Sequence, residues 1–143
     1  MVTSNACFAK YGAPDVNMER EHMTLWDVPQ IINMAIPEIP DKIYCNKDLV
    51  APLEQAFQNL IDRGLACHIM TWDGCFNIRK KRGGITFSLH SWGIAIDINA
   101  AWNAFGAEPQ MLAEVVKCFT DAGFEWGGTW TKKDGMHFQL AKI

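Results

Sequence analysis

The sequence predicts an α+β fold in which helices pack on one side of a small antiparallel sheet and polar strand residues share the open face. Two observations carry this prediction. In two segments apolar residues recur at three- and four-residue steps, as in helices, and in two others they alternate with polar residues, as in half-buried strands. The 143 residues, 49% hydrophobic and 20% charged, predict a single compact domain over residues 1–143.

The beginning of the chain is interrupted by prolines and has no clear periodicity. These are Pro14, Pro29, Pro37 and Pro40. We therefore expect residues 1–40 to be irregular and to wrap a core formed by residues 41–143. One short helix is predicted from about Trp26 to Met34.

The first clear helix is predicted at residues 47–63. Asn46 can cap its start, and Gly64 is typical of the position just past a helix end. The apolar stripe of this helix consists of Leu49, Val50, Leu53, Phe57, Leu60 and Ile61. A strand is then predicted at residues 66–72, followed by a turn at Asp73-Gly74.

A second strand is predicted at residues 94–99, because the isoleucines alternate with smaller or polar residues. The inward residues are Ile94, Ile96 and Ile98, and the opposite face carries Ala95, Asp97 and Asn99. A second helix is predicted at about residues 110–122, with Pro109 at its start and Gly123 at its end. Its predicted buried stripe is Leu112, Val115, Val116 and Phe119.

The last predicted strand, residues 136–141, alternates in the same way. Met136, Phe138 and Leu140 are expected to point inward, which leaves His137 and Gln139 on the other face. The polar faces of the two alternating strands would then look out on the same side of the sheet.

The charge of the chain excludes some partners. Lysine and arginine number 13 against 16 acidic residues, a formal net charge of -3, and the only basic cluster is Arg79-Lys80-Lys81-Arg82. A nucleic-acid partner is therefore not expected. No apolar stretch approaches the roughly 20 residues that span a bilayer, so no stable membrane insertion is expected. The N-terminus lacks an apolar core of signal-peptide length, which predicts synthesis in the cytoplasm, and we expect a monomer.

The cysteines predict no disulfide framework, because they are odd in number and scattered along a chain without a signal peptide. They are Cys7, Cys45, Cys67, Cys75 and Cys118. We expect each to be a reduced, mostly buried small hydrophobe.

The candidate chemistry lies in two segments, SLHSWGIAID and DGMH. His90, Asp97 and His137 offer imidazole and carboxylate ligands that suit zinc with one position left open. Asp134 precedes His137 by three residues, so a regular strand would point the two apart, although a bend at Gly135 can bring them together. Spacing alone leaves the metal site and purely structural roles about equally open.

These two segments resemble the zinc peptidase family of D-alanyl-D-alanine carboxypeptidases, dipeptidases and phage L-alanyl-D-glutamate endopeptidases. Its pattern is S-x-H-x-x-G-x-A-x-D, followed by an acid, two residues and a histidine, and the resemblance extends from about Lys47 to the C-terminus. It implies a hedgehog/D-Ala-D-Ala peptidase-like fold and one catalytic zinc held by His90, Asp97 and His137. It also implies that Asp134 is the catalytic acid and base. Many members use glutamate there, and aspartate resembles the phage branch.

The resemblance also implies an arginine upstream of the first motif that contacts the substrate carbonyl and its oxyanion. Arg79 is assigned to this role, with Arg82 as the competing candidate. Ser88 is expected to contact substrate or orient a ligand, or simply to cap a turn. Trp92 is a candidate for substrate binding, and Trp126 and Trp130 also flank the motifs, although core packing is the favoured role for all three tryptophans.

The expected function is hydrolysis of peptidoglycan stem peptides, as an L-alanyl-D-glutamate endopeptidase that serves as a phage or prophage endolysin and reaches the wall after host lysis. A first alternative is a D-alanyl-D-alanine carboxypeptidase or dipeptidase with the same metal chemistry. A second is a non-catalytic zinc-containing binding module, which the presence of Asp134 and Arg79 disfavours.

Overall fold

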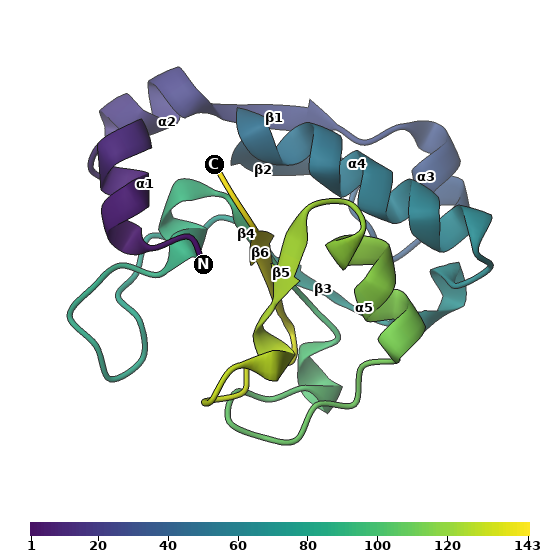
Figure 1. The fold of residues 1–143 in the computed structure, drawn as a ribbon. Helices are drawn as coiled ribbons and strands as arrows, with labels where there is room; N and C mark the ends of the chain where they lie inside the picture. Colours follow the sequence, from purple (N-terminus) through teal and green to yellow (C-terminus); the bar gives the residue numbers. More distant parts are fainter.

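The computed structural model, which describes residues 1–143, confirms the α+β class (Figure 1). The helices are α1 (Ser4–Tyr11), α2 (Val16–His22), α3 (Gln30–Ala35), α4 (Lys47–Asp62) and α5 (Ala113–Thr120). The strands are β1 (Met23–Asp27), β2 (Lys42–Asn46), β3 (Trp72–Gly74), β4 (Ala95–Ile98), β5 (Phe124–Trp126) and β6 (His137–Leu140). Short 3₁₀ helices are η1 (Ala66–His68), η2 (Leu89–Trp92), η3 (Ala100–Trp102) and η4 (Gly127–Thr129). None of the helices is both long and apolar enough to cross a membrane.

The central sheet has four antiparallel strands in the order β3-β4-β6-β5. In the β4–β6 pair, Asp97 lies opposite His137 and Ile96 lies opposite Phe138. Because side chains alternate between the faces of a strand, Ile96 and Phe138 share the core face while Asp97 and His137 share the other. The predicted alternation of both strands therefore produces the polar face from which the site is built.

Helices α4 and α5 cover the core face of this sheet (Figure 1). The ring of Phe119 on α5 stacks on Phe138, with centroids 4.4 Å apart, and Phe57 on α4 meets Trp72 of β3 edge to face. The prediction of helices on one side of a small antiparallel sheet is confirmed by these contacts.

The first long helix is where the sequence predicts it. The side-chain oxygen of Asn46 accepts a hydrogen bond from the backbone N–H of Asp48 at 2.9 Å, which satisfies one of the free amide groups of the first turn. Gly64 follows the helix with φ 70°, the left-handed conformation common at that position.

The second helix is shorter than predicted. It begins at Ala113 rather than near residue 110, because Pro109 packs against Gly135 of the loop before β6 instead of starting the helix. Leu112 precedes the helix and is 44% exposed, so its expected place in the buried stripe is wrong. Val115 and Phe119 are buried as predicted.

Residues 1–40 are not irregular, which corrects the expectation for this part of the chain. They hold α1, α2, β1 and α3, and Trp26 lies in β1 rather than in the predicted helix. The two strands β1 and β2 form a second, antiparallel sheet. The cap signals were present, since Thr3 and Asp15 cap α1 and α2, but each helix is too short to carry a visible apolar stripe.

The predicted strand at residues 66–72 is also wrong, apart from its last residue, Trp72. The side-chain oxygen of Asn99 accepts the backbone N–H groups of Met70 and Thr71 at 2.8 and 3.1 Å, and its amide donates to the carbonyl of His68 at 2.8 Å. One asparagine thus binds the backbone groups that a neighbouring strand would otherwise bind.

Three smaller expectations need correction. Met136 precedes β6 and lines the pocket described below instead of pointing into the core. Cys67 is exposed, whereas the other four cysteines are buried as expected, and all five are free thiols. Asp73 and Gly74 end strand β3 rather than forming a separate turn.

Gly93 is the position where the fold most depends on a glycine. It has φ 67°, and a Cβ there would lie 2.8 Å from the backbone nitrogen of Asn46 and 2.6 Å from the side chain of Met23. We expect Gly93→Ala to lower the free energy of unfolding by about 3 kcal/mol, from left-handed strain plus overpacking. Gly64→Ala is the matched control, because Gly64 has φ 70° with open space around it, and should cost about 1 kcal/mol. Urea unfolding measures both, and equal losses would contradict the close approach at Gly93.

Candidate metal centre

Three side chains from separate elements meet on the polar face of the sheet: His90 from η2, Asp97 from β4 and His137 from β6. His90 Nε2 lies 3.2 Å from His137 Nδ1 and 3.2 Å from Asp97 Oδ1. His137 Nδ1 lies 3.4 Å from the same oxygen. The histidines are buried and the aspartate is half-buried, so the structure brings together the three ligands that the sequence predicts.

The distances between these atoms fit a tetrahedral zinc ion. Ligand bonds of about 2.0–2.1 Å at tetrahedral angles put neighbouring ligand atoms roughly 3.3–3.4 Å apart. The three separations of 3.2, 3.2 and 3.4 Å match that spacing. Two imidazoles and one carboxylate are also a donor set that zinc binds with a fourth position open.

The hydrogen bonds around the two histidines direct their lone pairs to the same point. His90 Nδ1 lies 2.7 Å from the carbonyl oxygen of Cys75 and donates to it, which leaves the lone pair on Nε2. His137 Nε2 donates to Gln139 Oε1 at 2.9 Å, which leaves the lone pair on Nδ1. Asp97 Oδ1, the third atom, is buried and has no hydrogen-bond donor beyond these two imidazoles. A cation at this point satisfies all three.

The electrostatics of the cluster agree with cation binding. Burial disfavours the charge of Asp97, but the imidazoles of His137 and His90, when protonated, outweigh it through hydrogen bonds and charge and hold the pKa of Asp97 well below its usual range. Burial likewise works against a charged His137, yet contacts with Asp97 raise its pKa above the usual value. A proton is therefore attracted to the same point that a metal ion would occupy.

The local sequence explains how His90 is positioned. The Ser88 side-chain oxygen accepts the backbone N–H of His90 at 3.3 Å and caps η2, and Gly93 ends this 3₁₀ helix in the left-handed conformation. Ser88 also lines the pocket. It therefore caps the turn and is also placed to contact a ligand.

Asp134 lines the same pocket as His137, although residues three apart on a regular strand would point to opposite faces. The backbone turns before β6: the N–H of His137 donates to the Asp134 carbonyl at 3.1 Å, and the Asp134 N–H donates to the Gly127 carbonyl at 2.9 Å. Burial raises the pKa of the Asp134 carboxyl, the charge of His137 opposes this shift, and the charge of Asp97 adds to it. Such a carboxyl is suited to exchanging protons.

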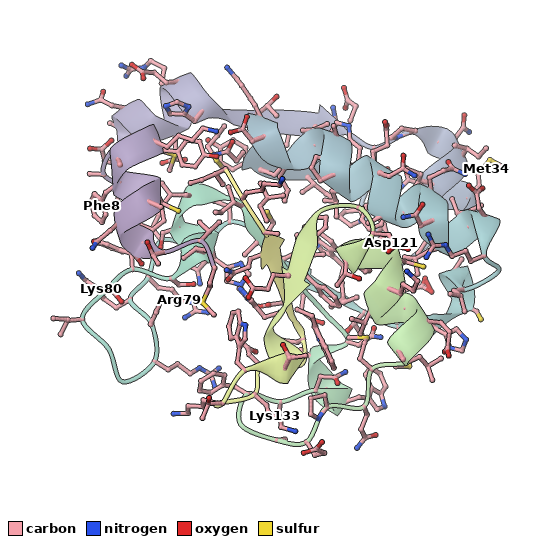
Figure 2. All side chains as sticks on the ribbon, in the orientation of Figure 1. Phe8, Met34, Arg79, Lys80, Asp121 and Lys133 are labelled. Atoms are coloured by element: carbon pink, nitrogen blue, oxygen red, sulfur yellow. The ribbon has the colours of Figure 1, made fainter.

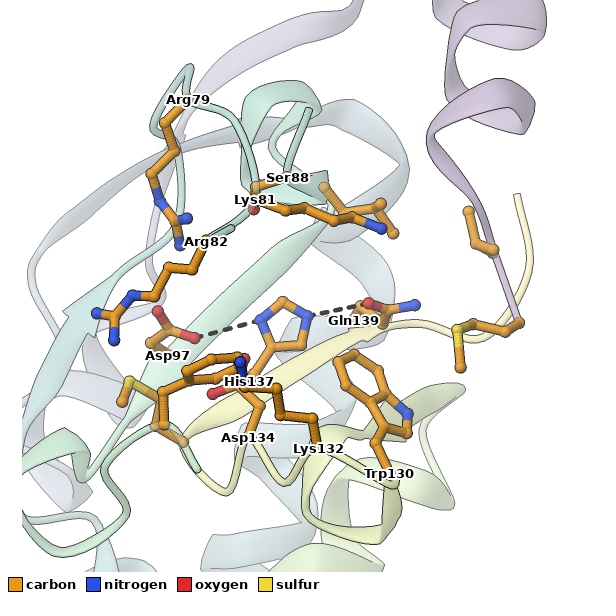
Figure 3. A pocket seen from close by; sticks show the side chains of 15 residues that line it. Arg79, Lys81, Arg82, Ser88, Asp97, Trp130, Lys132, Asp134, His137 and Gln139 are labelled. Atoms are coloured by element: carbon orange, nitrogen blue, oxygen red, sulfur yellow. Dashed lines mark hydrogen bonds and ion pairs between the residues drawn. The ribbon is translucent and has the colours of Figure 1, made fainter. Parts of the chain in front are cut away.

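The pocket has a volume of about 310 Å³, and cationic side chains surround its acids (Figure 3). The cations that line it are Arg79, Lys81, Arg82 and Lys132, against Asp97 and Asp134. In a chain with a net charge of -3, this concentration of positive charge favours an anionic ligand.

Both candidate arginines line the pocket, but they are held differently. The Arg79 backbone is fixed, since its N–H donates to Ser91 Oγ at 3.1 Å and its carbonyl accepts the Ser88 N–H at 2.9 Å. Arg79 is half-buried, whereas Arg82 is exposed and its guanidinium lies 5.3 Å from the ring of Phe105. Figure 2 shows Arg79 at the opposite end of the molecule from Met34 on α3, so α3 takes no part in the site.

Trp92 is not a substrate-binding residue, which corrects that prediction. Its side chain is fully buried, its indole N–H donates to the Gly12 carbonyl at 2.8 Å, and Phe8 packs against it edge to face. Trp126 also has a structural role, because its indole N–H donates to the Gly135 carbonyl at 2.8 Å and holds the turn after Asp134.

Trp130 also lines the pocket, together with Gln139 and Lys132, which were not predicted as site residues from the sequence. The ring of Trp130 lies 5.4 Å from that of His137. Gln139 could have been found from the sequence, because it alternates with His137 on the polar face of the last predicted strand. Lys132 carried no such signal, since it lies in a loop.

Comparison with known proteins adds two findings. The sequence profile of a family described as D-alanyl-D-alanine carboxypeptidase matches residues 82–140, which include all three metal-ligand candidates and Asp134. The crystal structure of the L-Ala D-Glu endopeptidase ChiX of Serratia marcescens is similar, with a TM-score of 0.44 and 22% identity over 67% of this chain and 80% of that chain. A search of curated proteins gives no match.

Proposed function

We propose that this chain is a zinc-dependent hydrolase of peptidoglycan stem peptides. The premise is the match of residues 82–140 to the peptidase family of D-alanyl-D-alanine carboxypeptidases. The observation that carries this proposal is the convergence of three ligand atoms beside a carboxyl of raised pKa, in a cationic pocket. Within this activity we propose cleavage of the L-alanyl-D-glutamate bond.

His90, Asp97 and His137 would hold the zinc. A bound zinc ion supplies Lewis-acid chemistry, which polarises a carbonyl and acidifies water. Asp134 accepts the proton of the attacking water and then gives it to the leaving amine. Its raised pKa suits both halves of this exchange, because a carboxylate with a pKa nearer to neutrality is both a better base and a readily reprotonated acid. Arg79 faces the pocket as a cation for the oxyanion that develops on the carbonyl.

Arg79, rather than Arg82, is proposed to meet the oxyanion, because its backbone is anchored and its side chain is half-buried. We expect Arg79→Ala to lower kcat about 10²–10³-fold, the effect of losing one preorganised oxyanion donor. Arg82→Ala is the matched control and should change kcat less than about 10-fold, since an exposed cation is screened. Steady-state kinetics on one peptide measures both, and a larger loss for Arg82→Ala would exchange the two roles.

The choice of bond is tested by mass spectrometry of digested peptidoglycan. The L-alanyl-D-glutamate activity predicts new fragments with N-terminal D-glutamate. Release of free D-alanine would instead identify a D-alanyl-D-alanine carboxypeptidase or dipeptidase, the second candidate, which the description of the matched family favours. An intact wall after incubation with the zinc-loaded protein would indicate a non-catalytic binding module.

We further propose a role as a phage or prophage endolysin that is made in the cytoplasm and acts on the wall after host lysis. Its support is the aspartate at position 134, which resembles the phage branch of the family. Expression in a bacterial host with a separately permeabilised inner membrane tests this role. Lysis that requires both permeabilisation and Asp134 would support it, and no lysis with active protein would reject it.

A further inference from the structure

Two hydrogen-bond donors in the pocket wall have no partner in the protein. Gln139 is only 3% exposed, and its Nε2 is buried without an acceptor. Trp130 Nε1 is buried without an acceptor as well. Both side chains line the pocket that contains Asp97 and His137. Since buried polar groups are almost always paired in native structures, these two donors are available to an acceptor that enters the cavity.

The metal ligands determine which end of the Gln139 amide faces the pocket. His137 can bind a metal through Nδ1 only if Nε2 carries the proton, and that proton is donated to Gln139 Oε1 at 2.9 Å. The Nε2 group of Gln139 must therefore point away from His137. Figure 3 shows this arrangement, with the Gln139 oxygen toward His137 and the nitrogen on the far side. One side chain thus fixes a metal ligand and presents a donor to the pocket.

The charge around these donors indicates the chemistry of the acceptor. Lys81 and Trp130 lie on the same side of His137 as Gln139 in Figure 3, and Lys132 also lines the pocket. Two N–H donors beside lysine side chains are suited to a carboxylate, which offers two oxygens and a negative charge. We propose that Gln139 Nε2 and Trp130 Nε1 form a carboxylate subsite that selects peptides with a free carboxylate next to the scissile amide.

This inference rests on the proposed function and deepens it, because it names a feature that both candidate bonds share. In D-alanyl-D-alanine, the residue that supplies the scissile nitrogen carries a free α-carboxylate. In a stem peptide that continues through the γ-carboxyl of D-glutamate, the same is true of the L-alanyl-D-glutamate bond. An internal peptide bond of an ordinary protein lacks this group, since its next residue continues through an amide. The subsite would therefore exclude the internal bonds of ordinary proteins.

The test uses two matched probes: N-acetyl-L-alanyl-D-glutamate γ-methylamide with a free α-carboxylate, and the same compound with an α-carboxamide. Calorimetric binding is measured on zinc-loaded Asp134→Asn protein, in which hydrolysis of the probes is expected to be slowed most. We expect the acid to bind at least ~10-fold more tightly than the amide, the effect of a charge-assisted hydrogen bond. In the double variant with Gln139→Glu, this preference should disappear, because glutamate still accepts from His137 but offers an anion in place of the donor.

The outcomes separate the subsite from the catalytic proposal. Trp130→Phe is a second variant that keeps a ring against His137 and removes only the N–H, and it should lower the preference more weakly. Zinc content is measured for every variant, so that a loss of metal is not mistaken for a loss of the donor. Equal affinity for the two probes, or an acid preference that survives Gln139→Glu with zinc bound, overturns the subsite. Selective binding of the acid without cleavage by the unmodified protein would retain the subsite and reject the proposed peptidase activity.

Discussion

His137→Ala is expected to remove both bound zinc and peptide hydrolysis. The imidazole supplies one of three converging ligand atoms, and its Nδ1 lies 3.2 Å from His90 Nε2 and 3.4 Å from Asp97 Oδ1. Its loss leaves two ligands, which is fewer than a catalytic zinc site uses. We expect about one zinc per chain in the unmodified protein by elemental analysis and a much lower content in the variant. Hydrolysis should fall to the background rate, and chelation of the unmodified protein should have the same effect.

His68→Ala is the matched histidine control. His68 is half-buried in η1 and lies outside the pocket, so its removal should leave zinc content and hydrolysis essentially unchanged. Readdition of zinc to the chelated protein should restore activity if the fold is retained. Full activity in a demonstrably metal-free preparation would reject the zinc mechanism.

Two of the three metal-centre residues could be placed from the sequence because they lie in regular alternating strands. Asp97 and His137 occupy polar positions between buried apolar ones, so their shared face follows from the two-residue period of a strand. Their direct pairing across β4 and β6 could not be predicted, because the register depends on tertiary packing. The long motif around His90 assigned His90, Asp97 and His137 to one metal site, through its resemblance to a known family rather than through spacing.

The predictions that failed have a common physical cause. In each case a contact with a residue far away in the chain decides the local structure or burial. Asn99 binds the backbone at residues 68–71 and prevents a strand there. Pro109 packs on Gly135 and delays the start of α5. Trp92 belongs to the core because α1 covers it, and α1 itself was not predicted. Each contact joins residues far apart in the chain, which a local pattern does not report.

Asp134→Asn is expected to keep zinc and lose about 10²–10⁴-fold in kcat, the usual contribution of a positioned acid or base. Asparagine has nearly the same shape, and Asp134 is not one of the three converging ligands, so the metal should stay bound. Asp134→Glu should retain part of the activity, because glutamate keeps a carboxylate that can accept and return a proton. Glu108→Gln is the matched control, since that carboxylate is exposed, pairs with Lys133 and lies outside the pocket. Loss of zinc in Asp134→Asn would instead make Asp134 a ligand.

The pH dependence of kcat/KM gives an independent test of the same assignment. A general base must be deprotonated in the free enzyme, so activity should fall as the pH falls through the pKa of Asp134. Because burial raises that pKa, the acidic limb should lie above the value of about 3.9 for an ordinary aspartate. The residual activity of Asp134→Asn should lack this limb over the range in which elemental analysis finds zinc still bound. If the limb persists unchanged in Asp134→Asn while zinc is retained, another group accepts the proton, and the division of roles between Asp134 and the metal ligands must be revised.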